Sequence, residues 1–295
     1  MIDDIHYDSL RRFATSSLAV LISKYSYVFA GREISNIRLK EYVKVATPLS
    51  GNRMALALKK GIRIVDLATK ETWAIKYKFP FSSLTQAGDL LAAHSVEDSD
   101  KIILFDLKRF KYVRALNVEN FQSMVGLPDG KLFCLLSTNQ GVIYSDGKSR
   151  SVELIPTEYD KCIFYKDNKI MLISNSGGEE QLFSFDCVSM VQTSLFKYKG
   201  IITAAVLLDK RIAYVARDKN LGIVAGRKRR FESFVIYSLN PLHGAVVVAE
   251  IDRLVVYNDI TLEKILSVRI KGSVHTTSSG RLVTISDFSE ISLFQ

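Results

Sequence analysis

Side chains able to bind a metal ion are few and scattered in this sequence. It contains four histidines, His6, His94, His243 and His275, and no pair of them has a metal-ligand spacing such as His-x-x-x-His. His94 and His275 fall inside segments with the pattern of β-strands, where a histidine is expected to be a hydrogen-bonded polar side chain. We therefore expect no metal site.

Candidate nucleophiles are equally sparse. The three cysteines, Cys134, Cys162 and Cys187, are widely spaced, odd in number and form no paired motif. A disulfide framework is excluded on this pattern, which favours a reducing, intracellular compartment: the cytoplasm, or the nucleus if the organism is eukaryotic. Cys134 stands between Phe133 and Leu135, so we expect it to be a buried apolar group without a neighbouring base to activate it.

Motifs for cofactor chemistry are missing from the sequence. It has no phosphate-binding loop, no dinucleotide fingerprint and no serine nucleophile elbow. We therefore predict a protein that is not an enzyme, with no cofactor and no small-molecule substrate. The alternative is an enzyme with a site in a central channel, for which Lys44, Lys161 and His275 are the candidates.

Composition indicates a globular protein with acidic partners. The 295 residues are 47% hydrophobic, enough for a large core and too much for disorder. Lys and Arg number 40 against 31 Asp and Glu, which gives a formal net charge of +9 and favours an acidic partner.

No secretory signal opens the sequence, and no apolar run approaches the roughly 20 residues of a membrane helix, so no membrane association is expected.

The sequence pattern of the predicted β-strands, which must position any functional site, repeats along the chain. Asp66, Asp106, Asp146 and Asp186 lie 40 residues apart, each after an alternating apolar run and before a polar turn and a second such run. Between these pairs lies another pair of apolar runs joined by a tight turn, as in residues 82–95 and 124–137. Four antiparallel strands per repeat of about 40 residues predict the blades of a β-propeller.

The third and fourth strands of these repeats resemble those of WD-repeat β-propellers. The segments IRIVDLATKETW, IILFDLKRFKYV and VVYNDITLEKIL place Asp66, Asp106 and Asn258 where that family has the aspartate of its Trp-Asp pair. No copy has the Trp, and the Gly-His pair of typical repeats is missing, so the resemblance extends to the propeller superfamily and to no closer family. It implies an all-β fold and a role as a scaffold for protein complexes.

Counting third strands predicts one propeller domain over residues 1–295 with eight blades. Residues 1–42 would form an N-terminal blade and close the ring, 43–272 the successive blades, and 273–295 a last blade. Ile2–Tyr7 would supply the outer strand that the last copy lacks, which leaves no exposed sheet edge. The alternative is seven blades preceded by an N-terminal helix over residues 8–23.

Strand order sorts the connections onto two faces of the predicted disc. Turns that join first to second and third to fourth strands share one face, and the remaining connections share the other. We predict that the first face is basic and binds the partner through nine residues: Lys108, Arg109, Lys111, Lys148, Arg150, Arg227, Lys228, Arg229 and Arg230. The other face is expected to be acidic, apart from Lys59 and Lys60, through residues that include Glu97, Asp98, Asp100, Glu119, Glu158, Asp160, Glu179, Glu180, Glu250, Asp252, Asp287 and Glu290.

These expectations combine into one functional prediction. A rigid ring that presents variable loops is suited to non-catalytic protein interactions, and its basic face would dock a protein with an acidic surface. The alternative is a nucleic-acid-binding propeller that uses the same basic face, since clustered cations attract phosphate backbones.

Overall fold

The described part of the chain consists of strands and their connections. The computed structural model describes residues 33–39, 41–154, 159–174, 180–208, 211–217, 220–230, 236–242, 244–250, 253–269, 272–276, 282–286 and 290–294. These residues contain no helix, and hence none that could span a membrane. The predicted helix over residues 8–23 and the predicted strand Ile2–Tyr7 lie outside the described residues.

The described residues form 28 strands, arranged in seven antiparallel sheets of four strands each. The first three sheets contain β2 (Val45–Pro48), β3 (Arg53–Leu58), β4 (Gly61–Asp66) and β5 (Thr72–Ile75); β6 (Ser83–Ala87), β7 (Leu90–Ser95), β8 (Asp98–Asp106) and β9 (Lys111–Asn117); and β10 (Phe121–Gly126), β11 (Leu132–Leu136), β12 (Gln140–Ser145) and β13 (Lys148–Glu153).

The remaining four sheets continue the same order. They contain β14 (Tyr159–Lys166), β15 (Lys169–Ser174), β16 (Glu180–Asp186) and β17 (Gln192–Lys197); β18 (Ile202–Leu207), β19 (Ile212–Ala216), β20 (Asn220–Ile223) and β21 (Lys228–Arg230); β22 (Ile236–Leu242), β23 (Ala245–Glu250), β24 (Arg253–Asn258) and β25 (Lys264–Arg269); and β26 (Gly272–Thr276), β27 (Leu282–Ser286), β28 (Glu290–Phe294) and β1 (Glu33–Arg38).

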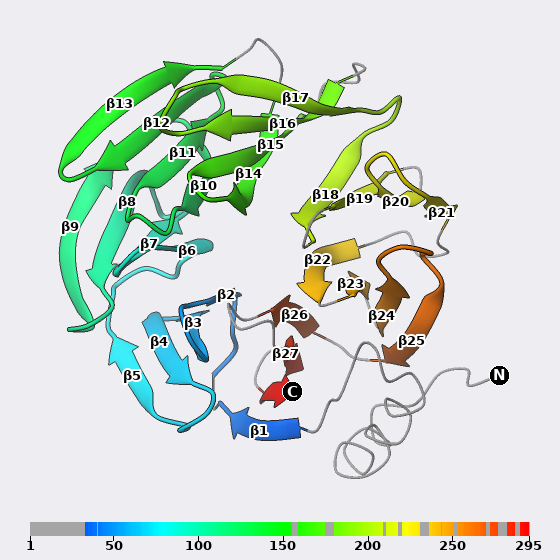
Figure 1. Ribbon diagram of the computed structural model, residues 1–295. Coiled ribbons are helices and arrows are strands. Elements are labelled where there is room, and N and C mark those ends of the chain that lie inside the picture. Colours follow the sequence, from blue (N-terminus) through cyan, green and yellow to red (C-terminus); the bar gives the residue numbers. More distant parts are fainter. Residues whose placement is uncertain are drawn as a thin grey trace.

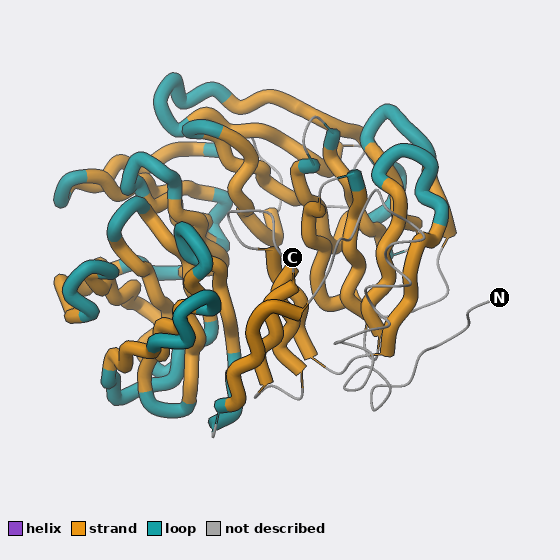
Figure 2. Tube along the Cα trace, turned by 60° about the horizontal axis from the view of Figure 1, so that its bottom comes forward, coloured by secondary structure: helices purple, strands orange, loops and turns teal. Residues whose placement is uncertain are grey.

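The sheets are arranged around a central axis as a β-propeller (Figure 1). The first strand of each sheet contacts the first strand of the next, from β2 through β6, β10, β14, β18 and β22 to β26, which contacts β2 again. The fourth strands lie on the circumference, and the same all-strand ring is seen from another side in Figure 2. The predicted all-β propeller of four-stranded antiparallel blades is therefore confirmed.

The favoured count of eight blades is wrong. The described residues form seven sheets, and the contact between β26 and β2 leaves no place in the ring for an eighth. The segment before residue 42, expected to be part of an N-terminal blade, instead supplies β1, the outer strand of the last sheet. Pairing of the two ends of the chain was expected, but through Ile2–Tyr7; in the structure Ile37 of β1 lies opposite Ile291 of β28.

Seven apolar clusters hold the ring together, one between each pair of neighbouring sheets. Successive residues of a strand enter different clusters: Leu91 and Ala93 of β7 face the preceding sheet, while Ala92 faces the following one. Because both faces of a sheet are buried, the second and third strands are continuous apolar runs. The cluster containing Met54 and Val283 joins the first and last sheets and closes the circle.

The repeated aspartates shape the turn between third and fourth strands. Asp186 Oδ1 accepts hydrogen bonds from the backbone N–H groups of Val188 and Ser189 at 2.9 and 3.0 Å. The same pair of bonds is made by Asp66, Asp106 and, through its amide oxygen, Asn258. These backbone hydrogen bonds hold the pKa values of Asp106 and Asp186 below their usual range.

The third aspartate in the series acts differently. Asp146 and Gly147 form the whole two-residue turn between β12 and β13, with φ angles of 48° and 82°. An Asp-Gly pair with both φ angles positive is the type I′ turn, whose twist matches that of the flanking strands. The regular spacing of 40 residues therefore covers two turn geometries.

We expect Asp186→Ala to lower the free energy of unfolding by about 1 kcal/mol, because two backbone N–H groups lose their acceptor. Asp186→Asn should retain most of the stability, since Asn258 makes the same bonds in another blade. Urea unfolding measures both variants. Asp186 also forms an exposed ion pair with Lys169 at 3.7 Å, and Lys169→Met is the control that removes this ion pair alone. Equal losses for the Ala and Asn variants would show that charge, and not the turn geometry, is responsible.

Candidate functional site

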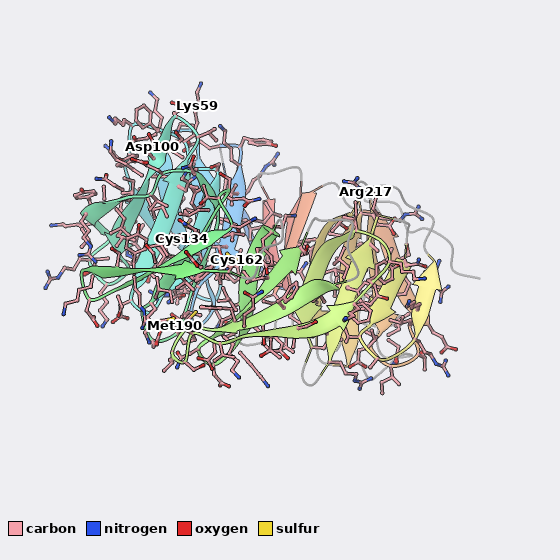
Figure 3. The ribbon with its side chains drawn as sticks, turned by 90° about the horizontal axis from the view of Figure 1, so that it is seen from above. Lys59, Asp100, Cys134, Cys162, Met190 and Arg217 are labelled. Carbon is pink, nitrogen blue, oxygen red and sulfur yellow. The ribbon has the colours of Figure 1, made fainter. Side chains whose placement is uncertain are left out.

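The antiparallel order of the strands in each sheet gives the ring two faces, each formed by a different set of connections. We call the side formed by the first-to-second and third-to-fourth turns the hairpin face, and the side formed by all other connections the linker face. Figure 3 shows this separation: Lys59, Asp100 and Arg217 lie along one side, and Met190, in the turn between β16 and β17, lies on the other.

Three of the predicted partner-binding residues lie at the turn between β8 and β9 on the hairpin face. Lys108, Arg109 and Lys111 are all exposed. Lys108 Nζ lies 2.5 Å from Asp89 Oδ2 in the neighbouring turn of the same sheet. Arg109 and Lys111 form no ion pair within the described chain, so their charges are available to a partner.

Lys148 and Arg150 stand at the corresponding edge of the next sheet and are also exposed. The two edges touch: a Cβ atom added to Gly147 would lie 3.2 Å from Arg114 Nη1 of β9. Tyr144 Oη of β12 likewise donates a hydrogen bond to the carbonyl oxygen of Asn117, at the end of β9. Arg114 and Asn117 lie in the half of β9 away from the β8–β9 turn, so Arg109 and Lys111 lie at one end of β9 and Lys148 and Arg150 lie beside its other half.

The basic run at the turn between β20 and β21 is partly occupied by internal contacts. Arg229 Nη1 donates a hydrogen bond to the carbonyl oxygen of Leu262 in the next sheet, at 3.0 Å. Lys228 Nζ lies 4.9 Å from the centroid of the Tyr198 ring. Arg227 is exposed, and the side chain of Arg230 lies outside what the structure describes. Arg229 thus helps to join two blades.

The structure does not bring these two basic groups together. β9 and β13 lie on one side of the ring and β21 on the opposite side (Figure 1). The sheet β14 to β17 separates β13 from β21 along the circumference. The nine predicted residues therefore form two separate regions.

Acidic side chains are interleaved with the basic ones on the hairpin face. Lys131 pairs with Asp129, Lys169 Nζ lies 3.7 Å from Asp186 Oδ2, and Arg211 Nη2 lies 3.8 Å from Asp259 Oδ2. The turn aspartates described above add further negative charge to this side. Positive charge is therefore concentrated at two sites instead of covering the whole face.

A hollow of about 850 Å³ opens on the hairpin face near the inner strands. Its walls come from the first turns of three successive sheets, with Phe164 of β14 and Thr276 of β26. The described lining includes Asp89 and Asp129 and no Lys or Arg. Backbones approach closely here, since a Cβ atom on Gly88 would lie 2.9 Å from Gly130 Cα. This hollow does not belong to a basic surface.

His94 is a structural side chain, as the sequence predicts. It is 7% exposed, its ring stacks on Phe121 with centroids 3.8 Å apart, and Nε2 donates to the carbonyl oxygen of Ser99 at 3.0 Å. Nδ1 is therefore the unprotonated nitrogen, and Ser82 Oγ lies 3.3 Å from it. Burial lowers the pKa of His94, so the ring is neutral near pH 7.

The cysteines are unsuited to nucleophilic chemistry. Cys134, Cys162 and Cys187 are buried, and burial raises the pKa of the Cys162 and Cys187 thiols to about 12 and that of Cys134 well above its usual value. In the part of the chain that the structure describes, no three His, Cys, Asp or Glu residues are close enough together to hold a metal ion.

The channel candidates do not assemble into a catalytic group in the described residues. Lys44 lies just before β2, and Lys161 lies in β14. Both side chains are exposed, and the two strands belong to different sheets. His275 of β26 is partly buried, and burial lowers its pKa to about 4. A neutral imidazole with such a pKa is a weak base near pH 7.

The lowered pKa values of His94 and His275 predict an acid-sensitive stability. In the unfolded chain both imidazoles titrate near 6.5, whereas the folded pKa of His275 is about 4 and that of His94 is also lowered. Between these values the unfolded chain binds protons that the folded chain does not, so the free energy of unfolding falls as the pH drops from about 6.5 to about 4.

Chemical denaturation at about pH 7 and about pH 4.5 measures this loss. A His94→Gln, His275→Asn double variant should lose less stability than the wild type over the same interval, because it lacks both titrating rings. If the wild type and the double variant lose the same amount, the acid sensitivity comes from other groups.

Comparison with known proteins supports the fold. No family model matches the sequence, and no curated protein matches it. Among solved structures, U3-55K has a TM-score of 0.69 at 9% identity, covering 88% of this chain and 98% of that one. The RRP9 WD40 repeats give 0.71 at 9% identity, with the same shares. The β-propeller domain of Cps50 (Swd1) from Myceliophteria thermophila gives 0.72 at 13% identity, covering 90% and 99%. The chain therefore has the fold of the WD-repeat propellers.

Proposed function

We propose that this chain, which has the WD-repeat β-propeller fold, is a non-catalytic interaction scaffold that docks an acidic protein partner on its hairpin face. Propellers of this fold are typically interaction scaffolds. The observation that carries the finer proposal is the outer patch, which consists of Arg109, Lys111, Tyr112, Lys148 and Arg150 on two adjoining blades.

The outer patch combines charge with an exposed aromatic ring. The side chain of Tyr112 in β9 is exposed, and the residue is 57% accessible beside Lys111. None of the four cations forms an ion pair within the described chain. Tyr and Arg are the residue types that most often dominate binding energy at protein interfaces. A partner with an acidic rim and a pocket for the tyrosine ring fits this combination.

The turn at Arg227 is a separate second region of the proposal. Replacing Arg227, Lys228, Arg229 and Arg230 together would remove the Arg229 contact with Leu262 as well as the charge. Such a variant would change blade packing in addition to binding. Arg227→Glu alone changes only an exposed charge and is the appropriate test of this turn.

The wild-type chain should capture an acidic protein from native extract treated with nuclease. We expect an Arg109→Glu, Lys148→Glu double variant to fail to capture this protein. Reversal of two charges on an otherwise unpaired basic patch replaces attraction by repulsion and slows association. Quantitative mass spectrometry of the captured proteins measures the difference. The thermal midpoint should be unchanged within about 2 °C, since both side chains are exposed.

Lys59→Glu, Lys60→Glu is the matched control, because it removes the same amount of charge from the linker face. The proposal fails if both double variants capture the same proteins as the wild type. Capture from untreated extract that is abolished both by nuclease and by the Arg109→Glu, Lys148→Glu change would instead support the alternative of nucleic-acid binding on this face.

A further inference from the structure

The outer strand β13 presents an exposed sheet edge on the circumference of the ring (Figure 1). All its residues are exposed except Val152, which is partly buried. Its partner in the sheet is β12, and no other strand of the described chain pairs with it. The edge of a sheet carries backbone N–H and C=O groups that can pair with a further strand.

Among the seven outer strands of the described chain, β13 combines length with regularity. It pairs with β12 over six residues without a shift in register. The pairings of β1, β9, β17 and β25 with their neighbours contain shifts in register, and β5 and β21 are only four and three residues long. Short strands and bulges are devices that block the addition of another strand. β13 has neither.

The turn before β13 determines which of its backbone groups face outward. A two-residue hairpin turn is closed by a hydrogen bond between the residues on either side of it, here Ser145 and Lys148. Along an antiparallel strand, residues that bond to the partner alternate with residues whose N–H and C=O groups point away from it. Ser149, Ser151 and Glu153 therefore direct these groups away from β12, toward the free edge.

The side chains on one face of this edge are basic. Lys148, Arg150 and Val152 share a face, because neighbouring residues of a strand point to opposite sides of the sheet. Val152 packs against the apolar cluster between this sheet and the next. A strand added to β13 would place its own residues opposite these three, about 5 Å away. The strand that fits has carboxylates opposite Lys148 and Arg150 and an apolar residue opposite Val152.

A second copy of β13 does not provide these carboxylates. Two copies related by a two-fold axis would pair their edges in antiparallel order, with outward-pointing residues opposite one another and the residues between them likewise opposite one another. Glu153 belongs to the outward-pointing set, whereas Lys148 and Arg150 belong to the other. No such register places the carboxylate of Glu153 opposite either cation. Charge complementarity therefore favours a strand from another protein.

We propose that β13 binds an extended acidic segment of a partner protein, which adds to its sheet as a fifth strand antiparallel to β13. Resting on the acidic docking proposed above, this mode of binding specifies how Lys148 and Arg150 hold the partner. Hydrogen bonds to the backbone of Ser149, Ser151 and Glu153 provide affinity. The two cations select a segment that has carboxylates at alternate positions.

Fluorescence anisotropy of the full chain with a labelled peptide, Lys-Val-Thr-Glu-Thr-Glu, tests this pattern. In antiparallel order the peptide places its valine opposite Val152 and its glutamates opposite Arg150 and Lys148. N-methylation of the first threonine removes an N–H that points at Ser151, and it should weaken binding by about tenfold. N-methylation of the first glutamate removes an N–H that points away from β13, and it should change the affinity by less than about twofold. A scrambled peptide of the same composition is the control for charge alone.

Variants at Ser151 test the edge from the side of the protein. Ser151→Pro removes the outward N–H and leaves the bonds to β12 in place, since proline is tolerated on an edge strand where its nitrogen faces solvent. It should weaken peptide binding by about tenfold, whereas Ser151→Ala should bind as the wild type does. Thermal unfolding checks that both variants keep the fold.

Charge reversal tests the selection of acidic segments. Lys148→Glu, Arg150→Glu should abolish binding of the peptide, because attraction to its glutamates becomes repulsion. Lys59→Glu, Lys60→Glu on the linker face changes the net charge equally and should leave the affinity unchanged.

Four results would overturn the proposal of strand addition. They are no binding of the peptide, equal binding of the scrambled peptide, equal effects of the two N-methyl groups, and wild-type affinity of Ser151→Pro. A dimer of the wild-type chain that Ser151→Pro dissociates would assign the edge to a second copy instead.

The proposed docking of an acidic protein is judged separately in nuclease-treated extract. Ser151→Pro should fail to capture the acidic protein that the wild type captures. If Ser151→Pro captures it and the Arg109→Glu, Lys148→Glu variant does not, the docking stands and strand addition is wrong.

Discussion

The structure depends on the burial of each sheet on both of its faces. Alternate residues of one strand, such as Met54 and Ala55 in β3, enter different apolar clusters and so require a neighbouring sheet on each side. A row of such sheets has no stable end, and only a closed circle covers every face. Closure also requires a fourth strand for the last sheet, which β1 supplies from the opposite end of the described chain. The ring then holds its turns in fixed positions, which is what an interaction surface needs.

Much of this architecture can be predicted from the sequence, because the pattern that reveals it is local. The aspartates 40 residues apart mark a turn whose backbone N–H groups require an acceptor, and Asn258 satisfies the same requirement where the aspartate is missing. The number of blades was predicted wrongly because alternating apolar residues show that a segment is suited to a strand but not which sheet it joins. REISNIR has the same alternation whether it continues an N-terminal blade or completes the last one, and only the contact between β26 and β2 decides.

The distribution of charge was harder to predict for a related reason. The turn aspartates were interpreted as markers of the repeat, although they are also charges on the hairpin face, where Asp89 and Asp186 lie beside Lys108 and Lys169. Arg229 was expected to face a partner and instead contacts Leu262, which no spacing rule indicates. Lys59 and Lys60 were expected as an exception on the linker face, whereas the nearby Lys44, Lys76 and Lys78 were not recognised as their neighbours, because they come from separate connections of the chain.

Closure of the ring by β1 is the central claim of this account, and native-state hydrogen exchange tests it most directly. The amides of β1 that donate hydrogen bonds to β28 should exchange only on global unfolding, at the same free energy as amides in the buried strand β3. Exchange of the β1 amides at the rate of an unstructured peptide, while β3 remains protected, would contradict closure through these residues and the seven-sheet ring that depends on it.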